Sequence, residues 1–439
     1  MDNVFTAVVA NDLCSGCGVC AGVAPCSMHM VCNRAGEYVP APPTECSDCG
    51  LCVRVCPFAS PLPCPAPSPL GNALAHYVGY MADADHRARA ASGGLTTGVL
   101  TELLRRGAVD GIVAVTPAHD PGTLFRAAIL DDPAQVMLSA KSRYYPIEFS
   151  DILRQVRAQR KRYAVVALPC TVRALRLAQA ACPWLAESLR YIIGLTCGHG
   201  VSKHYTSFLS HLAGLRPEQV TEVDYRVKAA TRADEYLFRA GTGARHGRPL
   251  ASARGPVGAV WTGYFFSLNA CHYCEDLFAE HADLSVMDAW LPQYASDPRG
   301  HSIVCVRNEA LHDLLQDMAH GETVVLQPLA EEQVLASQAV ALRFKSERLA
   351  ARLGALQRQG IGVPIGRVQP QARRVSLQDR LLQHQRRLSR LLVRGRSVRL
   401  MAGCAALRLN ITLGWGLLLR IRHLLGAVRR RADTTGKQT

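Results

Sequence analysis

The sequence predicts an α/β protein (α+β overall) with a small cysteine-rich module at its N-terminus and a helical, basic tail at its C-terminus. Three observations support this prediction. Closely spaced cysteines fill the N-terminal part, strands alternate with helices from about residue 72, and residues 370–439 hold most of the net charge of +15. A chain of 439 residues with 49% hydrophobic content can form two or three packed domains, so wholesale disorder is excluded.

The N-terminal module contains a cysteine run that is typical of iron–sulfur proteins. The run has the spacing C-x₂-C-x₂-C-x₃-C-P and comprises Cys46, Cys49, Cys52, Cys56 and Pro57. In bacterial-type ferredoxins this spacing holds cubane [4Fe–4S] clusters, and the fourth cysteine ligates the other cluster of a pair. A zinc site or a thioredoxin-like motif would need fewer cysteines at other spacings. We therefore expect a ferredoxin-like domain with two [4Fe–4S] clusters over residues 1–69, which ends in a stiff proline-rich linker.

A second, incomplete run lies upstream. It supplies three ligands and the proline, as Cys14, Cys17, Cys20 and Pro25. Ala24 occupies the place of the fourth cysteine, but ligand exchange between paired clusters would bring Cys56 to this set. The downstream run then needs a replacement ligand, for which Cys26 is the nearest candidate and Cys32 and Cys64 are weaker ones. A three-iron cluster or an empty second site remains the alternative.

The cysteine content also bears on the compartment. Seventeen cysteines grouped at cluster-ligand spacing indicate a reducing environment rather than a disulfide scaffold. No basic and apolar export signal precedes Cys14, so we expect a cytoplasmic protein.

The middle of the chain alternates between strand and helix patterns. Apolar runs predict strands at 77–80, 110–116, 163–168 and 191–195, and amphipathic runs predict helices near 171–180 and 202–213. Another helix should begin at about Leu95, with Ser92 as its N-cap and Gly107 as its end. This order predicts a mainly parallel sheet, in which ligands gather at the carboxyl ends of the strands.

Two cysteines lie at that expected edge of the sheet. Cys170 and Cys197 each follow a predicted strand, so they can converge although they are distant in sequence. Cys271 and Cys274 form a C-x-x-C motif further on, which alone would suit half a zinc site or a redox dithiol. Together the four thiolates could hold another cubane cluster. The alternative is that Cys170 and Cys197 are ordinary buried thiols.

Several motifs recur in an order that matches a known family. They are Ser92–Thr97, Val109–Gly111, Lys141–Tyr144, Leu168–Cys170 with Arg173, Ile193–Gly198, Cys271–Asp276 and Ala282–Trp290. Over residues 1–345 the chain resembles the coenzyme F420 hydrogenase/dehydrogenase beta-subunit family, whose members often carry a fused two-cluster ferredoxin region. The resemblance implies an FAD-binding N-terminal region at 72–155 and a catalytic and cluster region at 156–345, within an α/β flavin-binding domain.

The resemblance also implies a flavin site. It places FAD against Ser92, Gly93, Gly94, Thr97, Lys141, Ser142, Arg143 and Tyr144. A Ser-Gly-Gly turn at a helix N-terminus offers bare N–H groups and a positive dipole to a pyrophosphate, although it is also a common turn. Lys141 and Arg143 could offset the charge of the phosphates or of a reduced flavin. The chain departs from the family pattern at Ala24, at Met287, where glycine is usual, and in its basic tail.

These features predict an iron–sulfur flavoprotein oxidoreductase with two or three [4Fe–4S] clusters and FAD. It would exchange electrons with a redox partner protein or a reduced carrier of the ferredoxin or deazaflavin type. No residue is identified as catalytic, and His199 and His204 are the nearest candidates for a general acid. The alternative hypothesis is a non-catalytic electron-transfer or scaffold subunit of a larger complex.

The tail at 370–439 contains fifteen Arg and one Lys against two Asp, a net charge of +14. Its leucines alternate with arginines in the pattern of an amphipathic helix that lies on a membrane surface. We therefore expect peripheral attachment to an anionic membrane surface at its inner face, although a docking arm for a partner protein is the alternative. With Trp415 as its one aromatic residue, the tail offers no stacking platform, so we expect no nucleic acid.

Overall fold

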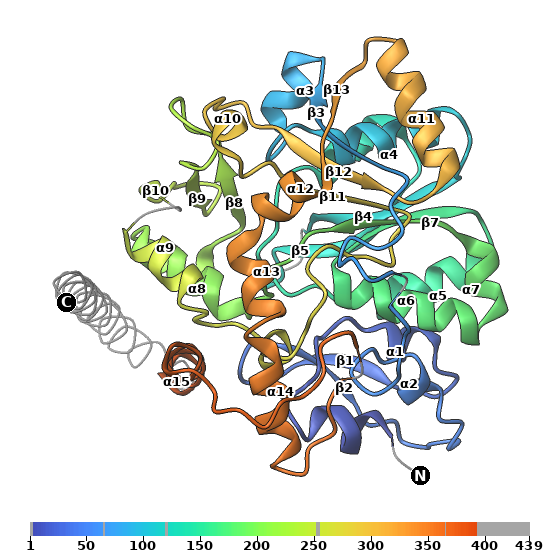
Figure 1. Cartoon of the computed structure of the whole chain (residues 1–439), viewed down its shortest axis with the longest axis vertical. Coiled ribbons are helices and arrows are strands. Elements are labelled where there is room, and N and C mark those ends of the chain that lie inside the picture. Colours follow the sequence, from blue (N-terminus) through green and yellow to red (C-terminus); the bar gives the residue numbers. More distant parts are fainter. Residues whose placement is uncertain (1–2, 65, 119–121, 252–254, 365, 393–439) are drawn as a thin grey trace, which may run out of the picture.

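The computed structural model describes residues 3–64, 66–118, 122–251, 255–364 and 366–392, and its centre is one large mixed sheet (Figure 1). In spatial order its strands are β13 (Val324–Pro328), β3 (Ala75–Met81), β12 (Ser302–Val306), β11 (Leu284–Asp288), β7 (Leu189–Leu195), β6 (Tyr163–Ala167), β4 (Gly111–Pro117) and β5 (Phe125–Leu130). Strands from 72–155 and from 156–345 therefore belong to a single sheet, in which β3 lies between strands of the second range.

The sheet is parallel only at its centre. Strands β4, β6, β7 and β11 pair in parallel, whereas β5, β12, β3 and β13 pair antiparallel. The prediction of a mainly parallel sheet thus holds for the central strands, which are joined by helical crossovers. Of the flanking strands, β3 was predicted, at 77–80, whereas β5, β12 and β13 were not, because an antiparallel partner does not need the same alternation with helices.

Helices cover both faces of this sheet. One face packs on α5 (Ser150–Gln159), α6 (Pro169–Ala181) and α7 (Pro183–Ser188), and the other packs on α4 (Leu95–Arg105) and α11 (Glu309–His320). Shorter helical segments join the strands: α3 (Ala84–Arg89), η2 (Pro133–Ser139), η3 (Pro217–Gln219), η4 (Asn269–His272) and α10 (Pro292–Ala295).

The predicted start of α4 was wrong in one detail. Its N-cap is Gly94, which has a φ of 85°, and no side chain caps the helix. Ser92 lies two residues too early to cap it, and its hydroxyl instead donates to the His301 carbonyl at 2.6 Å. The helix ends at Arg105, just before Gly107, whose positive φ suits a helix end.

The N-terminal module packs directly on the main body. It contains η1 (Phe5–Val9), α1 (Val19–Val23), the hairpin β1 (His29–Cys32) with β2 (Tyr38–Ala41), and α2 (Leu51–Arg54). Its buried side chains join one hydrophobic cluster with α5, α6 and α7, and Figure 1 shows the module against these helices. Gly18 makes this approach close, because a Cβ there would lie 2.8 Å from the Phe149 nitrogen.

A smaller sheet and a set of C-terminal helices complete the fold. The small sheet contains β8 (Glu222–Val227), β9 (Leu237–Gly241) and β10 (Leu250–Ala251), and it packs with α8 (Lys203–Leu212) and α9 (Gly255–Thr262). The C-terminal helices are α12 (Glu331–Ser337), α13 (Ala339–Lys345), α14 (Leu349–Gln357) and α15 (Leu377–Leu392). In Figure 1 they descend from the large sheet to the N-terminal module.

Candidate functional site: three groups of thiols and a cationic cleft

The first thiol group lies inside the N-terminal module. The loop before α1 supplies two of its cysteines, α1 supplies the third, and the fourth follows α2; they are Cys14, Cys17, Cys20 and Cys56. Burial, with a smaller contribution from the neighbouring thiols, raises the pKa of Cys14 and Cys56 to about 12. Four thiols so placed are costly to ionise unless a cation compensates them, which is what a bound iron cluster does.

The four cysteines expected at the second N-terminal site, which we call the second thiol group, lie nearer the surface, and their assembly into one site stays a prediction. Cys46 and Cys49 are exposed, whereas Cys52 and Cys26 are half-buried against the hydrophobic cluster that the module shares with the central helices. The weaker candidate Cys32 is exposed and lies near Lys203 and Glu37, not in that cluster.

The third thiol group forms within the main body. Cys170 lies in the first turn of α6, Cys197 follows β7, Cys271 lies in η4 and Cys274 comes just after it. Burial, together with the thiol of Cys274, raises the pKa of Cys170 to about 12. Burial, together with the thiols of Cys170 and Cys274, raises the pKa of Cys271 to about 12. The fold therefore brings together the four cysteines that the sequence indicated, and their ligation of a cluster stays a prediction.

The first and third groups are neighbours. After burial and Cys274, the thiol of Cys17 is the next influence that raises the pKa of Cys170. Cys170 in turn raises the pKa of Cys14. A cavity lies between the Cys56–Pro57 end of the module and the third group. It is lined by Pro57, Phe58, Cys170, Arg173, Tyr273, Cys274, Glu275, Leu349, Leu353 and Pro364.

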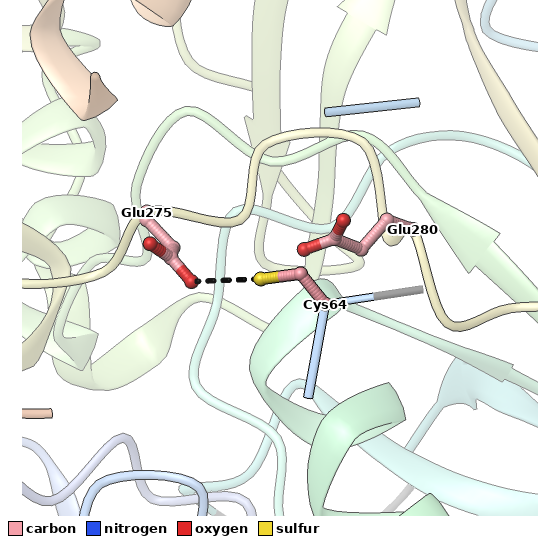
Figure 2. A group of neighbouring side chains, drawn as sticks. All are labelled: Cys64, Glu275 and Glu280. Carbon is pink, nitrogen blue, oxygen red and sulfur yellow. Dashed lines mark hydrogen bonds between the residues drawn. The ribbon is translucent and has the colours of Figure 1, made fainter. Parts of the chain in front are cut away.

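Cys64 lies beside two carboxylates rather than in a second cysteine set. Figure 2 shows Cys64 between Glu275 and Glu280, and the donor atoms of all three lie within 4.8 Å of one another. The carboxylates already have cationic partners, because Glu280 lies 2.5 Å from Arg367 and Glu275 lies 3.7 Å from Arg173. These guanidinium groups supply the positive charge that a metal ion would bring.

The two segments expected at a flavin approach one another through β8. Lys141 donates to the Arg226 carbonyl at 3.2 Å, and Arg226 lies 3.4 Å from the Tyr144 hydroxyl. Just beyond β8, Lys228 donates to the carbonyl of Ser92 at 2.9 Å. Residues 92–97 and 141–144 therefore line one region, which we call the cationic cleft.

The charge of the cationic cleft suits a phosphate-bearing ligand. Burial and, to a smaller extent, the nearby cations Lys141, Arg87 and Arg226 lower the pKa of Lys228 to about 7. The buried Nε of Arg143 has no hydrogen-bond partner among the described residues. An unpartnered guanidinium nitrogen and several mutually repelling cations would both be relieved by an anion.

Not every residue expected at the flavin is free to bind it. The Gly93 amide donates to the Ser302 hydroxyl at 3.1 Å, and the Ser92 hydroxyl is already bonded to His301. The hydroxyl of Thr97 lies 2.8 Å from His86 Nε2. Ser142 is half-buried beside Lys141 and Arg143. Ser92, Gly93 and Thr97 thus already have hydrogen-bond partners, so the backbone amides after Gly94 are the groups of this turn that are more available to an anion.

The histidine candidates for a general acid have other surroundings. His199 is buried, stacks on Tyr264 with ring centroids 4.3 Å apart, and has a pKa lowered to about 3 by burial with Lys345 nearby. It is therefore neutral at ordinary pH and would not act as an imidazolium acid. The ring of His204 lies 3.2 Å from the Arg34 carbonyl of the N-terminal module.

Sequence reasoning missed three residues that this geometry brings forward. Arg226 forms a two-armed ion pair with Asp288 at 3.0 and 3.2 Å, and Lys228 joins the two halves of the cationic cleft. Lys345 is buried against Cys274, with Nζ 3.2 Å from Sγ. None of them lies in a recognisable motif or in a strand or helix that the sequence predicted.

The start of the basic tail contacts the N-terminal module. Arg386 and Arg390 on α15, which were expected beside lipid head groups, both contact Asp12. Arg390 also lies 2.9 Å from Glu37. These two arginines therefore have carboxylate partners within the protein itself. Attachment of the tail to a membrane stays a prediction. Residues 393–439 lie outside the described residues, and within the described part no helix has the length and apolar character to cross a bilayer.

Comparisons with known proteins identify the middle of the chain. Residues 76–154 match the family described as coenzyme F420 hydrogenase/dehydrogenase, beta subunit N-term, and residues 160–332 match its C-terminal counterpart. The chain is 24% identical over 328 residues to a subunit of the F(420)H(2) dehydrogenase of Methanosarcina mazei, covering 73% of this chain and 86% of that protein. It is 23% identical over 258 residues to the beta subunit of the coenzyme F420 hydrogenase of Methanothermobacter thermautotrophicus, covering 55% and 80%.

A third relative and a solved structure extend the comparison. The coenzyme F420-dependent sulfite reductase of Methanocaldococcus jannaschii is 24% identical over 271 residues, covering 58% of this chain and 38% of that protein. Among solved structures, a chain of the F420-reducing [NiFe] hydrogenase complex from Methanosarcina barkeri aligns with a TM-score of 0.51 at 15% identity. That alignment covers 66% of this chain and 95% of the other, and it shows a shared fold.

Proposed function

The chain belongs to the coenzyme F420 hydrogenase/dehydrogenase beta-subunit family, and we propose that it is an iron–sulfur flavoprotein oxidoreductase. Its relatives are subunits of a hydrogenase and a dehydrogenase, and a sulfite reductase, which agrees with a redox role. The observation that carries the proposal is the third thiol group, where Cys170, Cys197, Cys271 and Cys274 meet next to the first group.

The proposal assigns a separate task to each group of residues. Clusters held by the thiols would supply single-electron transfer, and FAD in the cationic cleft would supply the exchange between single electrons and a hydride. The first set of ligands would be Cys14, Cys17, Cys20 and Cys56, the second Cys26, Cys46, Cys49 and Cys52, and the third Cys170, Cys197, Cys271 and Cys274. The domain that holds the first two sets would be a ferredoxin-like domain over residues 1–69.

The residues of the cationic cleft would bind and orient the flavin. Lys141 and Arg143 would contact its phosphates, because both are cations with side chains that are only half-buried. Asp288 holds Arg226 in place through two hydrogen bonds, so Arg226 would fix the position of Tyr144 at the same cleft. Tyr144 packs on Trp261 with ring centroids 4.5 Å apart, so aromatic side chains lie beside the cations of this region.

The burial of the thiol groups supports an order in which electrons would pass along them. The second group has exposed members, the first is enclosed in the module, and the third adjoins the first in the main body. A reduced carrier of the ferredoxin or deazaflavin type would therefore exchange electrons at one end of this series. Two of the relatives are named as subunits, one of a dehydrogenase and one of a hydrogenase. We therefore also propose that a redox partner protein binds this chain.

The test is purification without oxygen, followed by analysis of iron, acid-labile sulfide and acid-released flavin. We expect about eight or more irons per chain, with FAD, because each cubane site takes about four irons. Reduced coenzyme F420 is then added in the absence of other donors. Bleaching of the flavin and cluster absorbance supports the oxidoreductase. Iron without flavin would instead support the alternative of a non-catalytic relay subunit, and zinc in place of iron would contradict both.

A further inference from the structure

Lys345 is a buried cation that touches the third thiol group. It ends α13, is 2% exposed, and lies outside the range that matches the family. Its Nζ lies 3.2 Å from Cys274 Sγ and 3.0 Å from the Asp276 carbonyl oxygen. The ammonium group therefore has one sulfur and one backbone oxygen as acceptors, and its helix holds it in place.

The polar partners of the Lys345 ammonium group are a cysteine sulfur and a backbone carbonyl oxygen, and neither is a carboxylate. The side chain is almost fully removed from solvent, so water does not replace these partners. A buried ammonium needs a compensating negative charge, and four thiolates around an iron–sulfur core provide it.

The first thiol group has no such lysine contact. Among the described residues, no lysine or arginine donates a hydrogen bond to one of its four sulfurs, and the Gly16 amide donates to Cys14 Sγ at 3.4 Å. Anionic neighbours oppose the addition of an electron, whereas a neighbouring cation and hydrogen bonds to sulfur favour it. At the third group, the Gly200 amide also donates to Cys271 Sγ, at 3.1 Å.

We infer that Lys345 is a positioning residue that raises the reduction potential of the centre at Cys170, Cys197, Cys271 and Cys274 above that of the first group. This inference rests on the proposed function. With clusters at both groups, the one electron that the first group loses would be gained by the third, which would acquire one more negative charge. The ammonium group of Lys345 would stabilise that added charge, so electron transfer from the module into the main body would be downhill.

The experiment is a potentiometric titration of the intact protein, followed by electron paramagnetic resonance. The signal of the third group is first identified as the one that Cys170→Ala removes. We expect Lys345→Gln, which keeps a donor but removes the charge, to shift this signal to a more negative midpoint. At a fixed potential, the ratio of reduced to oxidised centre should change at least tenfold, which corresponds to a midpoint shift of about 59 mV for one electron. Lys345→Arg should restore the midpoint.

Arg343→Gln is the matched control, because it removes one positive charge from the same helix at a side chain that is 68% exposed. Its midpoint should equal that of the unaltered protein. An unshifted signal in Lys345→Gln would overturn the inference, as would loss of the signal in both Lys345→Gln and Lys345→Arg, since that marks a role in folding alone. If the unaltered protein has no signal that depends on Cys170, the proposed function fails instead.

Discussion

Arg390 Nη2 lies 2.9 Å from Glu37 Oε2, so the last described helix is fastened to the N-terminal hairpin by an ion pair that is largely shielded from solvent. Asp12 adds a second carboxylate partner for Arg390 and one for Arg386 at 3.4 Å. On the same helix, the Ser389 hydroxyl accepts a hydrogen bond from the Phe266 amide at 2.9 Å. Helix α15 thus joins the module to the main body, and the first prediction tests this contact.

Replacing Arg390 by alanine should destabilise the protein by about 2 kcal/mol, because Glu37 would remain buried without its partner. The midpoint of thermal or urea unfolding is the measurement. Arg387→Ala is the matched control, since Arg387 is exposed on the same helix and its loss should change the midpoint very little. Equal destabilisation by both changes would mean that helix propensity, and not the ion pair, is what the substitution alters.

Binding of iron at the third thiol group should require each of its four cysteines. We expect Cys170→Ala to remove about four irons and to block reduction of the flavin by an external donor, because a cubane cluster needs all its ligands. Iron analysis and stopped-flow absorbance check this. The buried Cys305, which lies in a separate hydrophobic cluster, provides the control: Cys305→Ala should keep its iron. Retention of iron in both variants would contradict the assignment.

The completeness of the second N-terminal site depends on Cys26. If Cys26 replaces the missing ligand, Cys26→Ser should remove or convert one cluster, with a loss of about one to four irons, because the site would have three cysteines. Cys32→Ser should have no such effect, since Cys32 is exposed and outside the shared hydrophobic cluster. Iron content and the spectrum of a three-iron cluster distinguish the outcomes. No change in Cys26→Ser would point to an incomplete or empty site.

Binding of FAD to the protein without flavin should weaken as the pH rises above about 7. Burial and the cations Lys141, Arg87 and Arg226 lower the pKa of Lys228 to about 7, with Asp297 acting in the other direction. Bound phosphate favours the protonated form of Lys228. Binding therefore takes up a proton at the pH values where Lys228 is deprotonated in the flavin-free protein. Fluorescence titration should show Kd increasing by up to about tenfold per pH unit, the limit for one proton.

Lys228→Met should make this pH dependence flatter and should weaken binding at pH 6. Lys161→Met is a suitable control, because Lys161 is exposed on the loop before β6. A steep pH dependence that persists in Lys228→Met would assign the titration to another group.

The tail can be tested with the boundary that the structure supplies. Because α15 packs on the module, a chain that ends at residue 392 keeps these contacts and removes only residues 393–439. We expect the full chain, but not this truncation, to float with anionic vesicles at low salt, since each basic residue adds up to about 1 kcal/mol at such a surface. Equal flotation of the two chains would remove the basis for membrane attachment, and flotation should disappear at high salt.

The sequence predicted those features of the protein that follow from the local spacing of residues. The ligand runs and the alternation of strands and helices are local patterns, so the central strands and the meeting of Cys170 with Cys271 could be anticipated. Ser92 looked like an N-cap because it is polar and precedes an apolar stripe, but the left-handed Gly94 sets the start of the helix.

Long-range partners could not be predicted in the same way. Nothing local to Lys345 indicates Cys274, and nothing local to Arg390 indicates Glu37, because each pair is brought together by tertiary packing of distant segments. The arginines of α15 carried a pattern that suits both a lipid surface and an acidic protein surface. Composition cannot separate these two partners, since both offer negative charge to an amphipathic helix.

The hydrophobic cluster shared by the module and the main body has a kinetic consequence. Carriers that swing on a linker must diffuse between donor and acceptor, so their turnover slows when the medium is made more viscous. Here Gly18 seats the ligand loop directly on the start of α5, and the Phe149 amide donates to the Cys17 carbonyl at 3.0 Å. Transfer between the first and third groups should therefore proceed at the same rate in buffer and in concentrated glycerol.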